Sequence, residues 1–473
     1  MTSTANPITD LSLADLAGLL RRRELSAREA LDAHLDRIAR VDPAINAICV
    51  LEPDAARRAA VAADERAASG AELPPLHGVP MTHKDTHDVA GMRSTAGCPV
   101  FADRVPDRDS PVVARLRAAG VVSTGKSNVP ELGAGSHTFN PLFGTTTNPW
   151  DPTRSAGGSS GGVAAAVAAG IQAAGDASDM GGSIRTPASF CGLVGLRPSA
   201  GVVPLGAADP WAWISRKGAI ARTVDDVRLM MSVLAAPGPL AAAPARPVPA
   251  GVAAGDLRGL RIGWSPDLGV GLPVEPGLVE VVARRVRALE RLGAVVEPAG
   301  PDLGDADEVF ATTRAHDFAT SYAELHAEHG DRLKPALRAN IARGRQLTAD
   351  DLRSAHRARV RLLAATTAFF GRYDLLVAPA VQVRPFDAAL EHPVEIDGRP
   401  LSGYLDWMRA ATLVSATGLP AMSVPAGLDE GGLPVGLQLV GPDGGDDLLL
   451  AVAAALETAE PWTARPPLWT AHR

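Results

Sequence analysis

The sequence predicts an α/β protein: one large domain with a central mixed β-sheet flanked by helices. Strand-like and helical segments are mixed in both halves of the chain, which indicates this class. Hydrophobic residues make up 46% of the 473 residues and charged residues 21%, as in a soluble globular protein with a sizeable core. We see no internal repeat that would indicate a solenoid or an array.

The first 70 residues are expected to form a helical segment that packs on the core. Ser26-Ala27-Arg28-Glu29 is a capping box, and apolar residues follow it at helical spacing. From residue 71 to residue 235 the pattern changes to short strands, glycine turns and Ala-rich helices. Within this part, Val163 to Ala169 is nearly all Ala and Val, which is typical of a buried helix packed closely on a sheet.

A Pro- and Ala-rich stretch, residues 236–256, is interpreted as a linker or surface loop. The next segments predict a βαβ unit, with strands at Arg261–Trp264 and Ala294–Glu297. The helix between these strands should bury one face, made of Val279, Val282, Val286, Leu289 and Leu292.

The remaining segments are expected to complete the same domain. Residues 257–410 include a charged helical region with a capping box at Thr348-Ala349-Asp350-Asp351, and this part should contribute to a pocket. Residues 411–473 return to strands, with a hairpin turn near 429–432, and close on a helix after Asp446.

Charge and cysteine content exclude several classes of protein. The net charge of −7 argues against nucleic acid or an anionic membrane as a main partner. Three cysteines far apart in the sequence suggest no disulfide framework, and we expect buried thiols in a reducing compartment. The N-terminus shows no signal-peptide pattern, and no apolar run approaches the ~20 residues of a membrane span. A cytoplasmic location is therefore expected.

Three short segments contain the residues that indicate a catalytic reaction. They are His77-Gly78-Val79-Pro80-Met81-Thr82-His83-Lys84-Asp85, Gly157-Gly158-Ser159-Ser160-Gly161-Gly162 and Asp179-Met180-Gly181-Gly182-Ser183-Ile184-Arg185. A serine hydroxyl is a weak nucleophile that needs a base, and no histidine lies in or beside either serine segment. A lysine that burial keeps neutral can act as that base, because desolvation lowers the lysine pKa by up to roughly 3–5 units.

These segments resemble the amidase signature family of Ser-cisSer-Lys hydrolases. The resemblance runs from about Leu73 to Arg197 and resumes at residues 373–379, 417–425 and 432–441. It implies the fold of that family, with residues 71–235 as the core that holds the catalytic residues. Ser183 follows 24 positions after Ser159, which is the separation usual in the family.

The resemblance implies a role for each motif residue. Ser183 corresponds to the nucleophile, Ser159 to the bridging serine with a cis peptide, and Lys84 to the base. The backbone N–H groups that correspond to the oxyanion hole belong to Met180, Gly181, Gly182 and Ser183. Supporting roles are expected for Asp179 and Arg185, as a buried pair that braces the turn, and for Ser160, as a hydrogen-bonding neighbour. No cofactor and no metal are implied.

The predicted function is therefore that of a metal-independent amidase that works through an acyl-enzyme, with esters and aryl carbamates (urethanes) as related substrates. The partner is a small molecule, and the protein is expected to be a monomer or a homodimer. Pocket walls are expected from Phe139 to Phe143, from Trp211 and Trp213, and from the helical part of residues 300–410.

Two alternatives within hydrolase chemistry remain open at this point. One is the glutaminase-type subunit of a tRNA-dependent amidotransferase, although this chain has Thr186 where that subunit usually has Gln. The other is a Ser-His-Asp esterase, because Gly158-Ser159-Ser160-Gly161-Gly162 fits the nucleophile-elbow pattern and would make Ser160 the nucleophile. A catalytically inactive binding protein is disfavoured because all three reacting groups are present.

Two further motifs suggest ligands, and both are disfavoured. Gly120 to Ser127 fits the nucleotide-binding Walker A pattern, but the preceding residues indicate a helix that Gly120 ends and a strand that begins at Val121. His83 and His87 lie four residues apart and could suggest a metal pair, yet no third ligand is evident.

Overall fold

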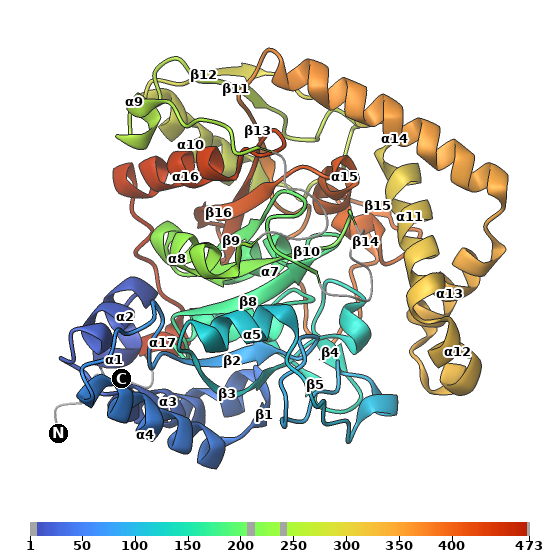
Figure 1. Cartoon of the computed structure of the whole chain (residues 1–473). Helices are drawn as coiled ribbons and strands as arrows, with labels where there is room; N and C mark the ends of the chain where they lie inside the picture. The colour runs from blue at the N-terminus through green and yellow to red at the C-terminus, as the bar shows by residue number, and fades with distance from the viewer. Residues whose placement is uncertain (1–6, 206–212, 237–243, 471–473) are drawn as a thin grey trace.

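The computed structural model describes residues 7–205, 213–236 and 244–470. Its main sheet contains eight strands: β8 (Ala174–Asp179), β9 (Val194–Arg197), β10 (Arg216–Ala221), β11 (Arg261–Trp264), β12 (Val295–Pro298), β13 (Leu375–Pro379), β16 (Ala421–Leu428) and β17 (Pro434–Val440). Their order is β12-β11-β13-β17-β16-β9-β10-β8. The first three strands in this order are parallel and the other neighbours antiparallel. Helices flank this mixed sheet (Figure 1), which confirms the predicted fold class.

A second, three-stranded sheet lies beside β8. It has the order β1-β3-β2, formed by β1 (Ile48–Leu51), β3 (Val122–Ser127) and β2 (Pro80–Lys84). Strands β2 and β3 are parallel, and β2 contacts β8 of the main sheet. The single central sheet of the prediction is thus extended by a smaller one, and Lys84 stands at the end of β2, where the two sheets meet.

The N-terminal part consists of four helices and one strand: α1 (Pro7–Asp10), α2 (Leu13–Arg21), α3 (Ala27–Ile45), β1 and α4 (Pro53–Ala68). The predicted capping box is present, because Ser26 Oγ accepts from Glu29 N and the Glu29 carboxylate accepts from Ser26 N. The expectation of helices alone is wrong at β1, a four-residue strand that pairs antiparallel with β3.

Two short helices behind the site are buried along their whole length. They are α6 (Gly161–Ala168) and α7 (Arg185–Cys191), and they pack together with α3. Small side chains let α6 approach its neighbours closely: a Cβ at Gly162 would lie 2.4 Å from the backbone nitrogen of Asn128. The buried helix predicted over 163–169 is confirmed.

The middle of the chain confirms the βαβ unit, in which α10 (Leu278–Arg291) joins β11 to the parallel strand β12. Its buried face differs from the prediction at two positions. Val279 and Leu292 are only partly buried, whereas Leu278 and Val281 are buried. The stretch interpreted as a linker lies partly outside the described residues. Its end forms α9 (Ala250–Ala253), and Val252 is buried in the main core.

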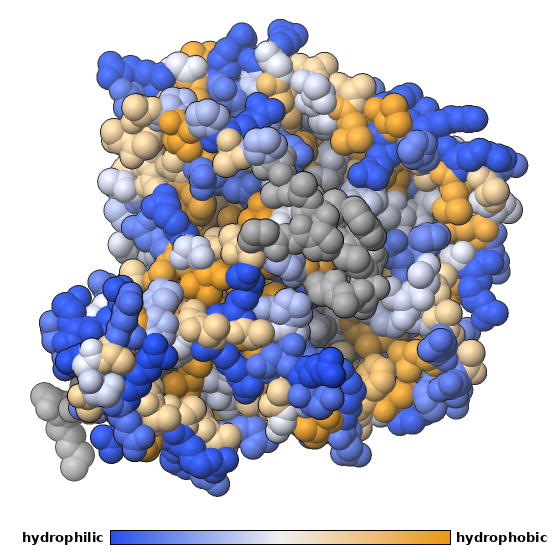
Figure 2. Space-filling view, viewed as in Figure 1, coloured by the Kyte–Doolittle hydropathy of each residue, from blue (hydrophilic) through white to orange (hydrophobic). Residues whose placement is uncertain are grey.

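A group of helices stands at one side of the molecule, at the right of Figure 1. It contains α11 (Ala306–Ser321), α12 (Ala323–His329), α13 (Pro335–Gln346) and α14 (Ala349–Phe370), and α11 also packs against α15 (Arg409–Thr417). The capping box predicted at Thr348 is present. Figure 2 shows hydrophilic side chains gathered at this side, as at the N-terminal helices.

The other elements complete the domain. They are α5 (Pro111–Ala118), α8 (Val224–Leu234), α16 (Asp446–Ala459), α17 (Pro467–Thr470) and the short pairs β4 (Phe139–Asn140) with β5 (Gly144–Thr145), β6 (Thr147–Asn148) with β7 (Asp151–Ser155), and β14 (Glu395–Ile396) with β15 (Arg399–Pro400). The hairpin of β16 and β17 and the helix from Asp446 are as predicted. In the described part of the chain, the helices are all too short or too polar to cross a membrane.

Candidate active site

The amine of Lys84 lies among three serine hydroxyls. Its Nζ is 2.8 Å from Ser159 Oγ, 2.8 Å from Ser160 Oγ and 2.9 Å from Ser178 Oγ. The lysine is completely buried. One nitrogen atom therefore joins three elements: strand β2, the glycine-rich turn before α6, and strand β8.

Burial, and then the charge of nearby Lys217, lowers the pKa of Lys84 well below its usual value. A neutral amine has two N–H donors and one lone pair, so it can donate to two hydroxyls and accept from a third. The Ser160 hydroxyl can itself donate to the Ser178 carbonyl at 3.4 Å. Lys84 can then donate to Ser160 and Ser178 and accept the proton of Ser159, as a general base must.

The glycine-rich turn places Ser159 beside the loop that carries Ser183. The peptide bond between Gly158 and Ser159 is cis, as the resemblance implied. Ser160 is the residue that precedes α6, and its backbone nitrogen donates to the Ser183 carbonyl at 3.2 Å. The turn and the Ser183 loop are therefore tied together directly through the backbone.

The loop after β8 is organised by the carboxylate of Asp179. It accepts hydrogen bonds from Gly182 N at 2.8 Å and Ile184 N at 3.2 Å, and two more from the Arg185 guanidinium, both at 3.0 Å. Arg185 also donates to Gln438 on β17 at 2.6 Å. The buried pair predicted from the sequence is confirmed, and it connects the loop to the centre of the main sheet.

Replacing Asp179 with alanine should lower the free energy of unfolding by about 3–5 kcal/mol, because it leaves buried arginine charges without their partner. Burial alone would raise the pKa of Asp179, but Arg185 and Arg197 outweigh it and hold the pKa well below its usual range. Chemical denaturation of the variant measures the change in the free energy of unfolding. The control is Asp225→Ala, which removes an exposed carboxylate that pairs with exposed Arg228 and should change little. Equal stabilities of the two variants would contradict a bracing role.

One predicted oxyanion-hole donor is already occupied. The N–H of Gly182 donates to Asp179, whereas the N–H groups of Met180, Gly181 and Ser183 donate to no described residue. Gly182 has φ +108°, and a Cβ there would lie 2.6 Å from the Cβ of Ala411. Glycine at this position shapes the loop, and the other three N–H groups have no acceptor in the part of the chain that the structure describes.

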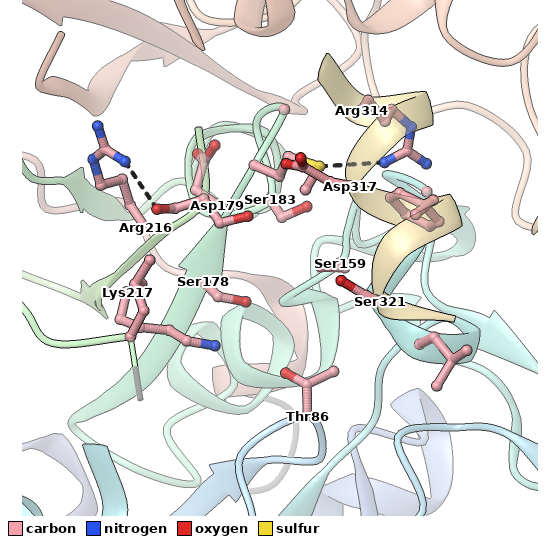
Figure 3. Close-up of a pocket in the computed structure, with 18 of the residues that line it drawn as sticks. Thr86, Ser159, Ser178, Asp179, Ser183, Arg216, Lys217, Arg314, Asp317 and Ser321 are labelled. Carbon is pink, nitrogen blue, oxygen red and sulfur yellow. Dashed lines mark hydrogen bonds between the residues drawn. The ribbon is translucent and has the colours of Figure 1, made fainter. Parts of the chain in front are cut away.

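Ser183 opens into a cavity of about 360 Å³. Figure 3 shows Ser183 and Ser159 between β10, which carries Lys217, and the helix α11. Ser183 is only 7% exposed, and its hydroxyl has no hydrogen-bond partner among the described residues. On the α11 side the cavity is lined by the apolar or aromatic side chains Phe310, Phe318, Tyr322, Met180 and Leu132.

The predicted pocket walls are correct only for the helical part of residues 300–410. Residues 139–143 do not line the cavity. They form β4 and the turn that leads to β5, and in this turn the Phe143 carbonyl accepts from Asn46 at 2.7 Å. Trp213 does not line it either, since its ring packs against the Arg359 guanidinium at 3.7 Å. Trp211 lies outside the described residues.

His83 and His87 both approach one buried carboxylate. Asp176 lies 2.9 Å from His83 Nδ1 and 2.5 Å from His87 Nδ1, and it accepts from Lys84 N at 3.2 Å. His83 Nε2 also contacts Ser123 Oγ at 2.8 Å. Three of the four imidazole nitrogens are therefore used within the protein, and the arrangement holds the end of β2 in place.

Prolonged treatment with EDTA or phenanthroline should leave kcat unchanged, because Asp176 and Ser123 engage three of the four imidazole nitrogens, which leaves too few ligands for a metal. The described residues contain no cluster of three or more side chains suited to a metal ion. The measurement is kcat before and after dialysis against chelator. A loss that added Zn²⁺ restores would establish a metal site at these histidines.

The esterase alternative, with Ser160 as nucleophile, is wrong in this structure. Ser160 is completely buried and its hydroxyl contacts Lys84 and the Ser178 carbonyl rather than a histidine. The Walker A interpretation also fails on geometry: Gly120, with φ +96°, follows helix α5, and residues 122–127 form β3. Lys126 is buried there, 3.5 Å from Asp85, and its amine donates to the His87 carbonyl and to the Ser94 hydroxyl.

Sequence reasoning missed three residues of the site: Ser178, Asp176 and Lys217. The first two lie on β8, immediately before the motif that begins at Asp179, so their position beside the motif was a possible signal. Lys217 gave no such signal, because it reaches the site through the pairing of β10 with β8, in which it stands opposite Ser178.

Comparisons with known proteins agree with the fold. A family model described as Amidase matches residues 29–450. An acylamidase from Rhodococcus erythropolis is 36% identical over 467 residues, which cover 97% of this chain and 97% of that protein. A glutamyl-tRNA(Gln) amidotransferase subunit from Thermosynechococcus vestitus is 35% identical over 486 residues, which cover 96% of this chain and 99% of that protein.

Among solved structures, that of a bacterial aryl acylamidase from the amidase signature enzymes has a TM-score of 0.88 and 29% identity, and the match covers 97% of this chain and 98% of that one. With the fold above, these matches define the protein as a hydrolase of carbon–nitrogen bonds in carboxamides, other than peptide bonds. The chain belongs to the amidase family, as an amidase signature enzyme.

Proposed function

We propose that Ser183 attacks the carbonyl carbon of the substrate, and that Ser159 and Lys84 form the proton relay that activates it. The observation that carries this proposal is the Lys84 amine 2.8 Å from Ser159 Oγ, with its pKa lowered by burial, next to a cavity into which the Ser183 hydroxyl opens. Serine requires such a base, and the surroundings of Lys84 supply it without a histidine.

In the first half of the reaction, the Ser183 proton passes to Ser159 Oγ as the Ser159 proton passes to Lys84 Nζ. Ser183 Oγ bonds to the carbonyl carbon and the carbonyl oxygen becomes an oxyanion. The carbon–nitrogen bond then breaks, and Lys84 returns its proton through Ser159 to the leaving amine. An acyl-enzyme on Ser183 and a neutral Lys84 remain.

Backbone donors stabilise the negative charge at each tetrahedral stage. We assign this role to the N–H groups of Met180, Gly181 and Ser183, which have no acceptor among the described residues, while Gly182 N–H stays with Asp179. Loss of a single such donor typically costs about 10²–10³ in rate. Water then attacks the acyl carbon and gives one proton to the same relay. The bond between Ser183 Oγ and the acyl carbon breaks, the relay returns that proton to Ser183 Oγ, and the carboxylic acid leaves.

The lining of the cavity supports amides with an apolar or aromatic group beside the scissile bond. Phe310 and Phe318 contribute ring surface from α11, and Met180 adds an apolar contact at the edge of the Ser183 loop. Esters and aryl carbamates present the same carbonyl carbon to Ser183 with a different leaving group, so we include both as substrates. We place the enzyme in the cytoplasm, as a monomer or homodimer acting on small molecules.

A panel of aryl anilides, aliphatic amides, nitrophenyl esters and aryl carbamates tests this function, with products identified by mass spectrometry. We expect hydrolysis of the anilides, and faster hydrolysis of anilides with an aromatic or long acyl group than of acetamide. Turnover of esters without any turnover of amides would contradict the proposal. The matched control is the Ser183→Ala variant on the same panel.

A second candidate is the glutaminase subunit of a tRNA-dependent amidotransferase, because one of the relatives, at 35% identity, is a glutamyl-tRNA(Gln) amidotransferase subunit. Thr186, directly after the Ile184-Arg185 pair, distinguishes the chain from the pattern usual in the glutaminase-type subunit. Ammonia release from L-glutamine decides between the two. Release faster than anilide hydrolysis would favour the glutaminase, and its absence alongside anilide hydrolysis supports the amidase.

A further inference from the structure

Among the described residues, Lys217 is the cation of the active-site cavity that the protein leaves without a partner. It lines the cavity and is partly buried, and its amine forms no hydrogen bond or ion pair with the described residues. The two arginines of the cavity are engaged. Arg216 donates to the carbonyls of Ser215 and Gly418, and Arg314 donates to the Tyr404 hydroxyl at 2.6 Å.

The sheet directs Lys217 towards the reacting groups. In the antiparallel pair of β10 with β8, Lys217 stands opposite Ser178, so both side chains emerge on the same face of the sheet. Ser178 Oγ lies 2.9 Å from Lys84 Nζ. Figure 3 shows the Lys217 amine pointing into the cavity between Ser178 and Thr86.

The opposite side of the cavity offers ring surface. There α11 presents Phe310 and Phe318, beside the polar side chains of Arg314, Asp317 and Ser321. Ser183 lies between this helix and Lys217 (Figure 3). A substrate whose scissile carbonyl reaches Ser183 therefore meets ring surface on one side and a lysine amine on the other.

The lysine is predominantly a cation at neutral pH, because burial lowers its pKa only to about 8. The carboxylate of Asp176 favours the charged form, as does that of Asp88, while burial lowers the pKa of the neighbouring Lys84 well below its usual value. A partly buried cation without a counter-ion is costly, and an anionic ligand that pairs with it removes that cost.

We propose that Lys217 binds a carboxylate of the substrate. The preferred substrates are then amides that carry an apolar group on one side of the scissile bond and a carboxylate on the other. This inference rests on the proposed function and names its substrate class. The carboxylate can belong to the acyl part, as in a monoanilide of a dicarboxylic acid, or to the amine part, as in an N-acyl amino acid.

Matched substrate pairs test the proposal on each side of the amide. The acyl-side series contains the monoanilides of malonic, succinic and glutaric acid, and the amine-side series contains the phenylacetyl amides of glycine, β-alanine and 4-aminobutyrate. Each acid is compared with a neutral analogue in which isopropyl replaces the carboxylate. The readout is the ratio of kcat/KM for the acid to kcat/KM for its neutral analogue.

In the wild type we expect this ratio to reach about 10 or more at one spacer length. The series in which it does so shows whether Lys217 binds a carboxylate of the acyl part or of the amine part. Lys217→Met should lower the ratio at least about tenfold, as loss of one charge-assisted hydrogen bond does. The control Arg345→Met removes an equal charge from an exposed position on α13 and should leave the ratio unchanged.

A ratio near one at every spacer length, or an equal ratio in the wild type and Lys217→Met, would overturn the proposal. If Lys217 only influenced Lys84, the variant would shift the pH profile of acids and neutral analogues together and leave the ratio as it was. Failure of the wild type to hydrolyse any anilide or amide would instead overturn the proposed function, so the two failures are distinguishable.

Discussion

Replacing Ser183 with alanine is expected to lower kcat for an anilide by about 10⁶-fold, the loss seen when another serine hydrolase loses its nucleophile. The acyl-enzyme cannot form without Ser183 Oγ, and neither Ser159 nor Ser160 can replace it, since both hydroxyls are engaged by Lys84. The measurement is single-turnover and steady-state hydrolysis of the best anilide of the panel. More than about 1% residual activity would exclude Ser183 as the nucleophile.

The same variant should unfold at nearly the same temperature as the wild type. The Ser183 hydroxyl faces the cavity and forms no hydrogen bond with the described residues, so its removal takes away no internal interaction. Ser321→Ala is a matched control, because Ser321 lines the same cavity from α11 but stands outside the proposed relay. We expect this control to keep most of the activity.

Replacing Lys84 with alanine is expected to slow amide hydrolysis by roughly 10³–10⁴-fold, because the relay loses its general base and the leaving amine loses its proton donor. Activated esters should suffer less, since a nitrophenolate leaves without a proton. The measurement compares kcat/KM for an anilide with kcat/KM for the nitrophenyl ester of the same acid. An equal loss for both substrates would contradict the role of Lys84 in protonating the leaving group.

The pH dependence and the arginine variant test the same assignment. Lys84 must be neutral to accept a proton, so kcat/KM of the wild type should rise with pH along an acid limb that reports the coupled Ser159–Lys84 system. Because the pKa of Lys84 is lowered, this limb should lie below the usual lysine range. Lys84→Ala should flatten this acid limb.

Lys84→Arg should not restore activity, since a guanidinium stays protonated. Near wild-type amide turnover by this variant would refute the relay.

The sequence was sufficient to predict the fold class and the three motifs that meet at the candidate site. Lys84, Ser159 and Ser183 lie in three separate motifs, and the glycines around the two serines indicated turns in which a side chain can approach a ligand. The Asp179–Arg185 pair was also predictable, because both residues belong to the same short loop and opposite charges buried together must pair.

Features that depend on pairing between distant segments could not be predicted. Strand β1 has only four residues, none fully buried, and forms because β3 supplies its hydrogen-bonding partner. Ser178 and Lys217 become neighbours of Lys84 only when β10, β8 and β2 are brought together.

Two details of the cavity also could not be predicted from the local sequence. The N–H of Gly182 is occupied because the Asp179 side chain turns back onto its own loop. Phe310 reaches the Ser183 loop from α11, where a Cβ at Gly181 would lie 2.7 Å from its ring. Neither the direction of a side chain within a loop nor the contact of a remote helix follows from residue types at fixed spacing.

Trapping of the acyl-enzyme tests the central claim most directly. A nitrophenyl carbamate transfers a carbamoyl group that leaves a serine slowly, so the labelled enzyme can be digested and mapped by mass spectrometry. We predict one added carbamoyl group per chain, on the hydroxyl of Ser183, and no added mass in Ser183→Ala. A label on Ser159 or Ser160, or an equal label in the Ser183→Ala variant, would contradict the account.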